Sequence, residues 1–253
     1  MNFLSTAQFE LHDLNRLLES AVKYKNGHTA RPLDGKSVAL VFFNPSLRTR
    51  ASMQVGIYEL AGNAVILEPG STSWTLEHRE GAVMDGNKSE HLKEFVRVLE
   101  RYVSAIGVRT FAELKDWETE RTDPILNAFA RYASVPVINL ESAMHHPCQA
   151  IADMMTIREK LGDQKRKVLL TWAWHPKPLP MAVPNSFALA AAQFGHDLRI
   201  AHPRGYELDE ELIRDAKHFA AANGGTVGIT HDLEQAYEGV EVVYAKSWGG
   251  KDF

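Results

Sequence analysis

Two periodicities of apolar residues alternate along the chain. Short runs rich in β-branched and other apolar residues occur at 37–43, 63–68, 104–109, 136–140, 166–172, 197–201, 226–229 and 241–245. Stretches with apolar residues at helical spacing separate these runs, at 48–61, 89–102, 122–132, 147–161, 185–194, 209–223 and 232–238. Strands that alternate with helices in this way form parallel sheets whose faces the helices cover. The pattern therefore predicts an α/β fold.

The alternation is long enough for two lobes, each a parallel β-sheet covered by helices. We expect a first domain over residues 1–146 and a second over 147–253, joined by the helix that follows His146. The chain ends soon after the run at 241–245, where a parallel sheet normally continues into a covering helix. The second lobe is therefore expected to be truncated at its C-terminal side.

Two further segments have a local interpretation. Ser5-Thr6-Ala7-Gln8 has the sequence of a capping box, and leucines then recur at helical spacing until Asn26, which predicts an opening amphipathic helix. The charge-dense stretch 77–101 is expected to be a solvated loop and helix face.

Composition limits the classes of protein to which the chain can belong. Of its 253 residues, 45% are hydrophobic and 24% are charged, which is typical of a folded globular protein. The longest apolar runs, 38–43 and 187–192, fall far short of the ~20 residues of a membrane span. The net charge of −4 provides no overall basic field for nucleic acid, so a bound anion must be met by a local cluster.

The expected compartment is the cytoplasm. Cys148 is the single cysteine, so no intrachain disulfide can form, which fits a reducing environment. The first residues lack the basic and apolar regions of an export signal. We expect neither a membrane partner nor a nucleic-acid partner.

No signature of a cofactor or a metal is found in the sequence. It contains no G-x-G-x-x-G and no G-x-x-x-x-G-K-[ST] motif, and the pair His145 and His146 lacks an H-E-x-x-H pattern or a carboxylate at ligand spacing. We therefore expect no cofactor and no metal.

The segment 42–50 is a candidate anion site. It follows an apolar strand and opens a helix, so the hydroxyls of Ser46 and Thr49 lie at a helix N-terminus. Arg48 and Arg50 add two guanidinium groups. The alternative is an ordinary helix cap flanked by surface arginines.

A second candidate segment, His146-Pro147-Cys148-Gln149, follows the run at 136–140. Parallel sheets bind ligands beyond the carboxyl ends of their strands. An imidazole and a primary amide three residues apart can meet a carbonyl oxygen and an NH2 group. Cys148 is expected to be a structural thiol rather than a nucleophile, because no base partner is evident.

Together the two segments resemble the aspartate/ornithine carbamoyltransferase superfamily. Its phosphate loop has the form S-x-R-T-R, which Ser46 to Arg50 match, and its carbamoyl loop has the form H-P-x-Q, which His146 to Gln149 match. Phe43-Asn44-Pro45, the Thr171-Trp172 and His175 to Leu179 segments, and Tyr244 to Gly249 resemble the branch that acts on N-acetylornithine. The resemblance extends along essentially the whole chain. It implies a knotted loop, near 176–184, in full-length members.

The resemblance implies roles for the matched residues. Carbamoyl phosphate would be bound by Ser46, Leu47, Arg48, Thr49, Trp74, Arg109, His146, Pro147, Cys148 and Gln149. Of these, Arg48 would meet the phosphate charge, Arg109 would bridge phosphate and carbamoyl oxygen, and His146 would polarise the carbonyl. Gln149 would hold the carbamoyl nitrogen. Trp74 would act in the site of a neighbouring subunit of a homotrimer. The acetylornithine substrate would be contacted by Glu141, Lys246 and Glu90.

The implied reaction transfers the carbamoyl group of carbamoyl phosphate to the δ-amine of N-acetyl-L-ornithine, in arginine biosynthesis. Ornithine, N-succinylornithine and aspartate are alternative acceptors. In the superfamily the position of Glu90 is glutamate in enzymes that use acetylornithine and proline in those that use succinylornithine. A truncated, non-catalytic subunit that binds phosphate ligands or sister subunits is an alternative of another class. The adjacent His145 leaves open which of the two histidines faces the carbamoyl group.

Overall fold

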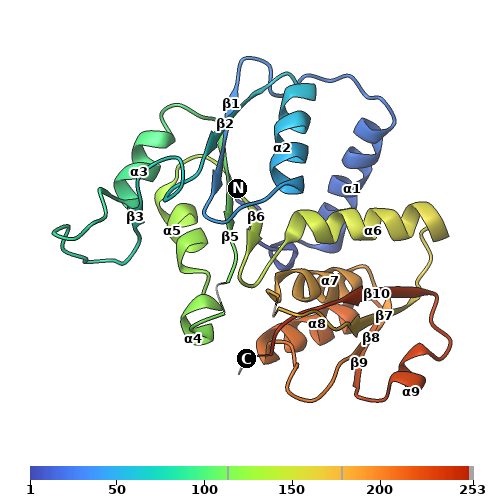
Figure 1. Cartoon of the computed structure of the whole chain (residues 1–253). Coiled ribbons are helices and arrows are strands. Elements are labelled where there is room, and N and C mark those ends of the chain that lie inside the picture. The colour runs from blue at the N-terminus through green and yellow to red at the C-terminus, as the bar shows by residue number, and fades with distance from the viewer. Residues whose placement is uncertain (113, 178, 251–253) are drawn as a thin grey trace. The chain divides into compact units, whose positions relative to one another are not determined.

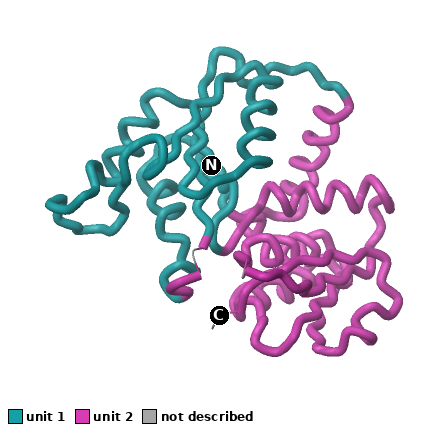
Figure 2. The backbone as a smooth tube through the Cα atoms, in the orientation of Figure 1, with its two compact units in different colours: residues 1–4, 27–111, 118–143 teal, residues 5–26, 112–117, 144–253 magenta. Residues whose placement is uncertain are grey.

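The computed structural model describes residues 1–112, 114–177 and 179–250 (Figure 1). Its contacts divide the chain into two compact units (Figure 2). One unit comprises residues 1–4, 27–111 and 118–143, and the other comprises 5–26, 112–117 and 144–253. Pro178, in the loop for which the resemblance implies a knot, lies outside the described residues.

The opening helix belongs to a different unit from the one expected. Helix α1 (Leu11–Lys25) belongs to the second unit, whereas the sequence placed it in the first domain. Its Leu18 is buried in the hydrophobic core of the second unit, and contacts with helix α6 (Pro147–Leu161) hold it there. The capping box at Ser5 is present, but it caps the 3-10 turn η1 (Thr6–Gln8) rather than α1.

The sheet of the first unit has the strand order β2-β1-β5-β6, with every pair parallel. The strands are β1 (Ser37–Phe42), β2 (Asn63–Leu67), β5 (Ala105–Thr110) and β6 (Val137–Ser142). Strand β1 lies inside the sheet, and its side chains alternate between two cores. Val38 and Leu40 pack on the side of helix α2 (Arg48–Glu59), while Ala39 and Val41 pack with α3 (Leu92–Leu99) and α5 (Pro124–Tyr132). This double burial explains why the run reads as continuously apolar.

Residues 76–101 correct one expectation and refine another. Two short strands, β3 (Leu76–Glu77) and β4 (Glu90–His91), pair in parallel, so the helix expected from residue 89 begins only at Leu92. Most charged side chains of the stretch are exposed, as expected, but Glu77 is only 4% exposed. Its carboxylate accepts hydrogen bonds from the backbone N–H groups of His78 and Arg79 and forms ion pairs with Arg79 and Lys88. The charges of this stretch therefore organise a loop around one buried carboxylate.

The second unit also contains a fully parallel sheet, in the order β10-β7-β8-β9. Its strands are β7 (Lys167–Trp172), β8 (Asp197–Ala201), β9 (Thr226–Thr230) and β10 (Val242–Lys246). Helix α7 (Ala182–Gln193) is buried along almost its whole length and is packed between this sheet and helices α6 and α8 (Glu210–Ala222). The short helices are α4 (Trp117–Glu120) and α9 (Leu233–Tyr237).

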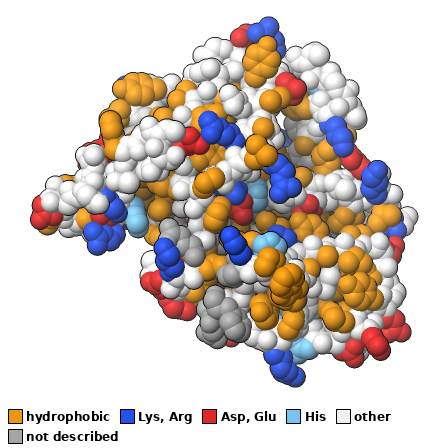
Figure 3. Space-filling model, in the orientation of Figure 1, with side chains coloured by type: hydrophobic (Ala, Val, Ile, Leu, Met, Phe, Trp, Pro, Cys, Tyr) orange, Lys and Arg blue, Asp and Glu red, His pale blue; other side chains and the backbone are white. Residues whose placement is uncertain are grey.

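Among the described residues, no helix is long and apolar enough to cross a membrane. Lys and Arg side chains are interspersed with Asp and Glu on the face shown in Figure 3, which agrees with the small net charge of −4.

Candidate active site

The predicted phosphate loop lies at the carboxyl end of β1, where the chain turns into α2. Arg48 is the first residue of α2, and the Thr49 N–H donates to Ser46 Oγ at 3.3 Å. Leu47 is 85% exposed, so the loop is open to solvent at this residue. The first N–H groups of a helix have no partner within the helix and attract anions. This geometry suits a phosphate group.

The two arginines of the loop have different surroundings. Arg50 Nη1 donates to Glu68 Oε1 at 2.6 Å, so this guanidinium is engaged in an ion pair. Arg48 is exposed, and among the described residues its side chain has no hydrogen-bond or ion-pair partner. Of these two arginines, only Arg48 is therefore available to an incoming anion without breaking a contact among the described residues.

Arg109 and Glu141 lie opposite each other at the carboxyl ends of the neighbouring strands β5 and β6. The register shifts between Val108 and Arg109, and this irregularity sets Arg109 against Glu141. Their side chains form a short ion pair and are both largely buried. The guanidinium also lies 5.0 Å from the ring centroid of Phe111, and its buried Nε has no hydrogen-bond partner among the described residues. The sequence predicted both residues but not their pairing.

Asn44 joins the phosphate loop to the Arg109 strand. Its side-chain oxygen accepts a hydrogen bond from the Phe111 N–H at 3.0 Å, and the Phe43 N–H donates to the Arg109 carbonyl at 2.9 Å. Sequence reasoning noted Asn44 in the motif but assigned it no role. These contacts fix the end of β1 against the end of β5, so the structure brings the phosphate loop, Arg109 and Glu141 to one edge of the first sheet.

Trp74 and Glu90 are also brought together. Trp74 Nε1 donates to Glu90 Oε2 at 3.0 Å. The indole is 59% exposed, in keeping with a side chain that reaches outward from a loop. Glu90 is held in place because β4 pairs with Leu76 of β3.

The adjacent histidines of the second unit face different surroundings. His145 Nδ1 lies 3.4 Å from Ser5 Oγ, and burial lowers the pKa of its imidazole to about 4. His146 occupies the position before the first turn of α6, where its N–H donates to Ser186 Oγ at 2.7 Å and its carbonyl accepts from the Ala150 N–H. Pro147, the first residue of α6, fits this start because a helix needs no N–H there.

The remaining residues of the H-P-x-Q segment lie on the first turn of α6. Burial raises the pKa of the Cys148 thiol to about 11, so it stays protonated at neutral pH and is a poor nucleophile. Gln149 Nε2 donates to Asp153 Oδ1 at 2.8 Å. Asp153 was not predicted, although its spacing of four residues from Gln149 is the spacing of neighbours on a helix.

Lys246 is the last residue of β10, paired with Trp172 of β7. Its Nζ donates to the Ser247 carbonyl at 2.7 Å. The segment after it is anchored through Trp248, which is 1% exposed and donates from Nε1 to the Tyr206 carbonyl. Trp172 Nε1 donates in turn to the Trp248 carbonyl, so the end of β10 has a defined conformation.

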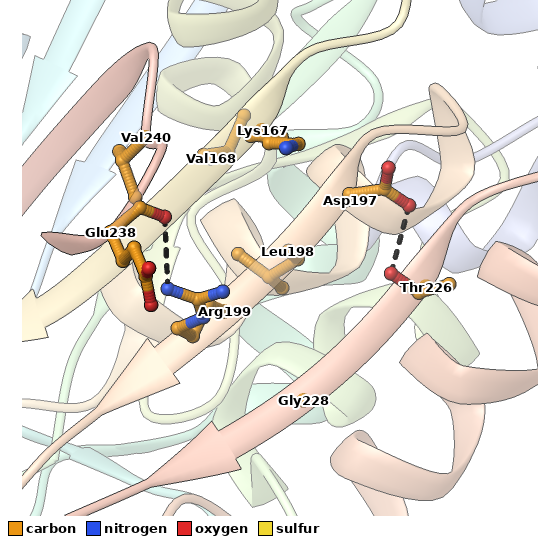
Figure 4. A pocket seen from close by; sticks show the side chains of 9 residues that line it. All are labelled: Lys167, Val168, Asp197, Leu198, Arg199, Thr226, Gly228, Glu238 and Val240. Atoms are coloured by element: carbon orange, nitrogen blue, oxygen red, sulfur yellow. Dashed lines mark hydrogen bonds between the residues drawn. The ribbon is translucent and has the colours of Figure 1, made fainter. Parts of the chain in front are cut away.

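A cavity of about 320 Å³ lies in the second unit at the amino ends of β7, β8 and β9 (Figure 4). Its charged groups serve the fold: Arg199 donates to carbonyls at the end of α9, and Thr226 donates to Asp197 at 2.8 Å. None of the predicted site residues lines it. Across the described ranges, no group of three His, Cys, Asp or Glu side chains is placed to hold a metal ion.

Comparison with known proteins connects this geometry with a family. Residues 1–159 match the family model "Aspartate/ornithine carbamoyltransferase, carbamoyl-P binding domain", and residues 180–252 match "Aspartate/ornithine carbamoyltransferase, Asp/Orn binding domain". The chain is 44% identical to an N-acetylornithine carbamoyltransferase of Xanthomonas campestris, over 100% of this chain and 75% of the relative. It is 41% identical to an N-succinylornithine carbamoyltransferase of Bacteroides thetaiotaomicron, over 84% of this chain and 64% of the relative.

Solved structures give the same result. An acetylornithine transcarbamylase complexed with acetylcitrulline is 44% identical, with a TM-score of 0.97 over 100% of this chain and 77% of that chain. A variant of N-acetyl-L-ornithine transcarbamylase complexed with carbamyl phosphate and N-succinyl-L-norvaline has the same identity, coverage and TM-score. The two-lobed parallel α/β fold predicted from the sequence is thereby confirmed, and the chain belongs to the aspartate/ornithine carbamoyltransferase family of enzymes.

Proposed function

We propose that this carbamoyltransferase transfers the carbamoyl group of carbamoyl phosphate to the δ-amine of N-acetyl-L-ornithine, as a step of arginine biosynthesis in the cytoplasm. The observation that carries the proposal is the S-x-R-T-R loop at the start of α2, with Arg48 uncommitted beside the helix N-terminus. The relatives named for N-acetylornithine, and a solved one complexed with acetylcitrulline, support this acceptor.

In this proposal the donor is bound mainly by charge and by backbone N–H groups. Carbamoyl phosphate is held by Ser46, Leu47, Arg48, Thr49, Trp74, Arg109, His146, Pro147, Cys148 and Gln149. Arg48 and the first N–H groups of α2 meet the phosphate, and Arg109 bridges the phosphate and the carbamoyl oxygen. To do so, Arg109 has to share its guanidinium with Glu141, its present partner.

The chemistry requires no covalent enzyme intermediate. The neutral δ-amine attacks the carbonyl carbon, and His146 and Arg109 stabilise the negative charge that develops on the carbonyl oxygen. The tetrahedral intermediate then loses phosphate, with cleavage of the carbon–oxygen bond, and the amine proton leaves with phosphate or solvent. His145 is less suited to the polarising role, because its Nδ1 lies 3.4 Å from Ser5 Oγ and is engaged there.

The acceptor is proposed to be contacted by Glu141, Lys246 and Glu90. Lys246 supplies positive charge for the α-carboxylate, and Glu141 accepts hydrogen bonds from substrate nitrogens. Glu90 would repel the extra carboxylate of a succinyl group, whereas a neutral acetyl group carries no such penalty. N-succinylornithine is the second candidate acceptor, because a relative with that name is 41% identical.

A homotrimer with shared sites is part of the proposal. The exposed Trp74 indole, held by Glu90, would then complete the phosphate site of a neighbouring subunit.

The test is an assay of ureido-product formation from carbamoyl phosphate with N-acetylornithine, N-succinylornithine, ornithine or aspartate. We expect the highest kcat/KM with N-acetylornithine. The absence of product with every acceptor, combined with the absence of phosphate binding, would refute the proposed function. A preference for another acceptor would refute the assigned substrate alone.

A further inference from the structure

We propose that Asp153 is a positioning residue, which orients the Gln149 amide so that its oxygen faces the carbamoyl nitrogen. The inference rests on the proposed function, in which Gln149 meets that nitrogen. It starts from the 2.8 Å hydrogen bond between Gln149 Nε2 and Asp153 Oδ1, which joins the first turn of α6 to the next.

The direction of this hydrogen bond decides what Gln149 can offer to a ligand. A side-chain amide has a donor face and an acceptor face and can present either one. An ionised carboxylate only accepts hydrogen bonds, so Asp153 selects the orientation in which Nε2 points along the helix. The amide oxygen is then the atom left to accept from a ligand. A carbamoyl NH2 group donates and needs such an acceptor.

The surroundings of Asp153 favour this role over a simple surface pair. Its second oxygen is buried and has no hydrogen-bond partner within the described part of the chain. Burial raises the pKa of the Asp153 carboxyl to about 6, so it is mostly ionised at neutral pH, and Tyr244 of β10 offsets part of that rise. The Tyr244 ring is stacked on Phe187 at 4.0 Å between centroids. A carboxylate that is partly desolvated and contacted from two elements is held more firmly than an exposed pair of neighbours on a helix.

The test compares two ligands that differ in one group. Phosphonoacetamide carries an NH2 group next to its carbonyl, and 2-oxopropylphosphonate carries a methyl group in the same place with the same charge. The ratio of their dissociation constants, measured by calorimetry on the 253-residue chain, reports the hydrogen bond to that NH2 group. We expect the wild type to favour phosphonoacetamide by about tenfold, the worth of one such hydrogen bond.

Asp153→Asn is expected to lower this preference by about two- to tenfold. An asparagine can either donate to or accept from Gln149, so the amide populates both orientations, and equal populations alone give about a twofold loss. Asp153→Leu removes the acceptor, so the amide is again free to take either orientation, and we expect a loss of at least about twofold. Asp209→Asn, at a buried carboxylate that caps α8, should leave the ratio unchanged and shows that a general loss of stability does not mimic the effect.

A double substitution tests whether Asp153 acts on the ligand through Gln149. In a Gln149→Ala protein the preference should be lost, and adding Asp153→Asn should change it no further. The inference is overturned if neither Asp153 variant changes the ratio while Gln149→Ala removes it. It is also overturned if Asp153→Asn has the same effect with and without Gln149. Failure of the wild type to bind inorganic phosphate or either ligand overturns the proposed function, and the inference with it.

Discussion

Replacing Arg48 by alanine is expected to weaken phosphate binding while leaving the fold intact. The guanidinium is exposed at the first residue of α2, and within the described ranges it has no side-chain partner. Because its removal breaks no contact of the folded chain, we expect the free energy of unfolding to change by less than about 0.5 kcal/mol. The whole effect should therefore appear in ligand affinity.

The expected loss of phosphate affinity follows from the strength of one hydrogen bond between Arg48 and the phosphate. A hydrogen bond between charged groups contributes about 1.5–3 kcal/mol. Loss of one such contact lowers affinity roughly 10- to 150-fold at 25 °C. The exposed position favours the lower end of this range, because water screens the interaction. Phosphate and carbamoyl phosphate should be affected alike, since both present the same anionic group.

Arg50→Ala is the matched control, from the same loop and with the same change in charge. Arg50 is already engaged with Glu68 at 2.6 Å. Its loss should cost less than about 1 kcal/mol of stability, as for other exposed ion pairs, and should change phosphate affinity only severalfold through the general loss of positive charge. Calorimetric titration with inorganic phosphate, together with urea unfolding of both variants, measures the two quantities separately.

Two results would show that this reasoning is wrong. Equal phosphate affinity in Arg48→Ala and the wild type would show that Arg48 does not bind the phosphate. An equal and large loss of affinity in both variants would mean that the ion pair of Arg50 does not keep it from the ligand.

Four further predictions concern other parts of the molecule. Trp74→Ala and Arg109→Ala proteins, each inactive alone, should regain some activity when mixed under conditions of subunit exchange, because one intact shared site can form; no recovery after confirmed exchange would place Trp74 in its own chain's site. Glu90→Pro should shift the ratio of kcat/KM values from N-acetylornithine towards N-succinylornithine. An unchanged ratio would show that repulsion between Glu90 and the succinyl carboxylate does not set the preference. Phe129→Ala should lower the free energy of unfolding in urea by about 3–5 kcal/mol, because Phe129 is fully buried in the core between α5, α3 and the first sheet; a loss below 1 kcal/mol would contradict that packing. Burial lowers the pKa of His145 to about 4 in the folded chain, below its ordinary value of 6.5, so between these pH values the unfolded chain binds a proton that the folded chain does not. The free energy of unfolding should therefore fall as pH drops from 6.5 to 4, by at most about 3 kcal/mol. The same fall in a His145→Gln protein would assign the effect to another group.

The pattern of apolar residues predicted most elements because the buried face of a helix or strand repeats with the period of that element. Strand β1 is covered on both faces, so its run of apolar residues is unbroken and unmistakable. The two-residue strands β3 and β4 are too short to show a period, and they depend on pairing across an intervening loop. The same limit explains why the helix expected from residue 89 begins at Leu92.

The placement of α1 shows a different limit of the sequence pattern. Amphipathic spacing indicates that Leu14 and Leu18 face a core, but not which core. In the structure Leu18 packs with residues of the second unit, and the neighbouring turn η1 contacts α7. A division into domains by position along the chain therefore misplaces a helix that crosses over.

The site residues were found by motif, but their electrostatic partners were not. Arg48 and Arg50 are equivalent as letters in S-x-R-T-R, and only the fold shows that Glu68, beyond the next strand, engages one of them. Likewise, the pairing of Arg109 with Glu141 depends on a register shift between β5 and β6, which leaves no mark in either segment. Contacts between residues distant in sequence decide which charges are available.

The Arg109 and Glu141 pair has a consequence for the order of events at the site. Two largely buried charges stabilise each other, and removing the partner of one leaves the other uncompensated at a cost of several kcal/mol. A phosphate that shares Arg109 therefore weakens the ion pair between Arg109 and Glu141. In the proposed reaction the nitrogens of the acceptor donate hydrogen bonds to Glu141 in compensation, so binding of the donor increases the free energy gained when the acceptor binds. Glu141→Gln should uncouple the two events, because a neutral amide needs no such compensation.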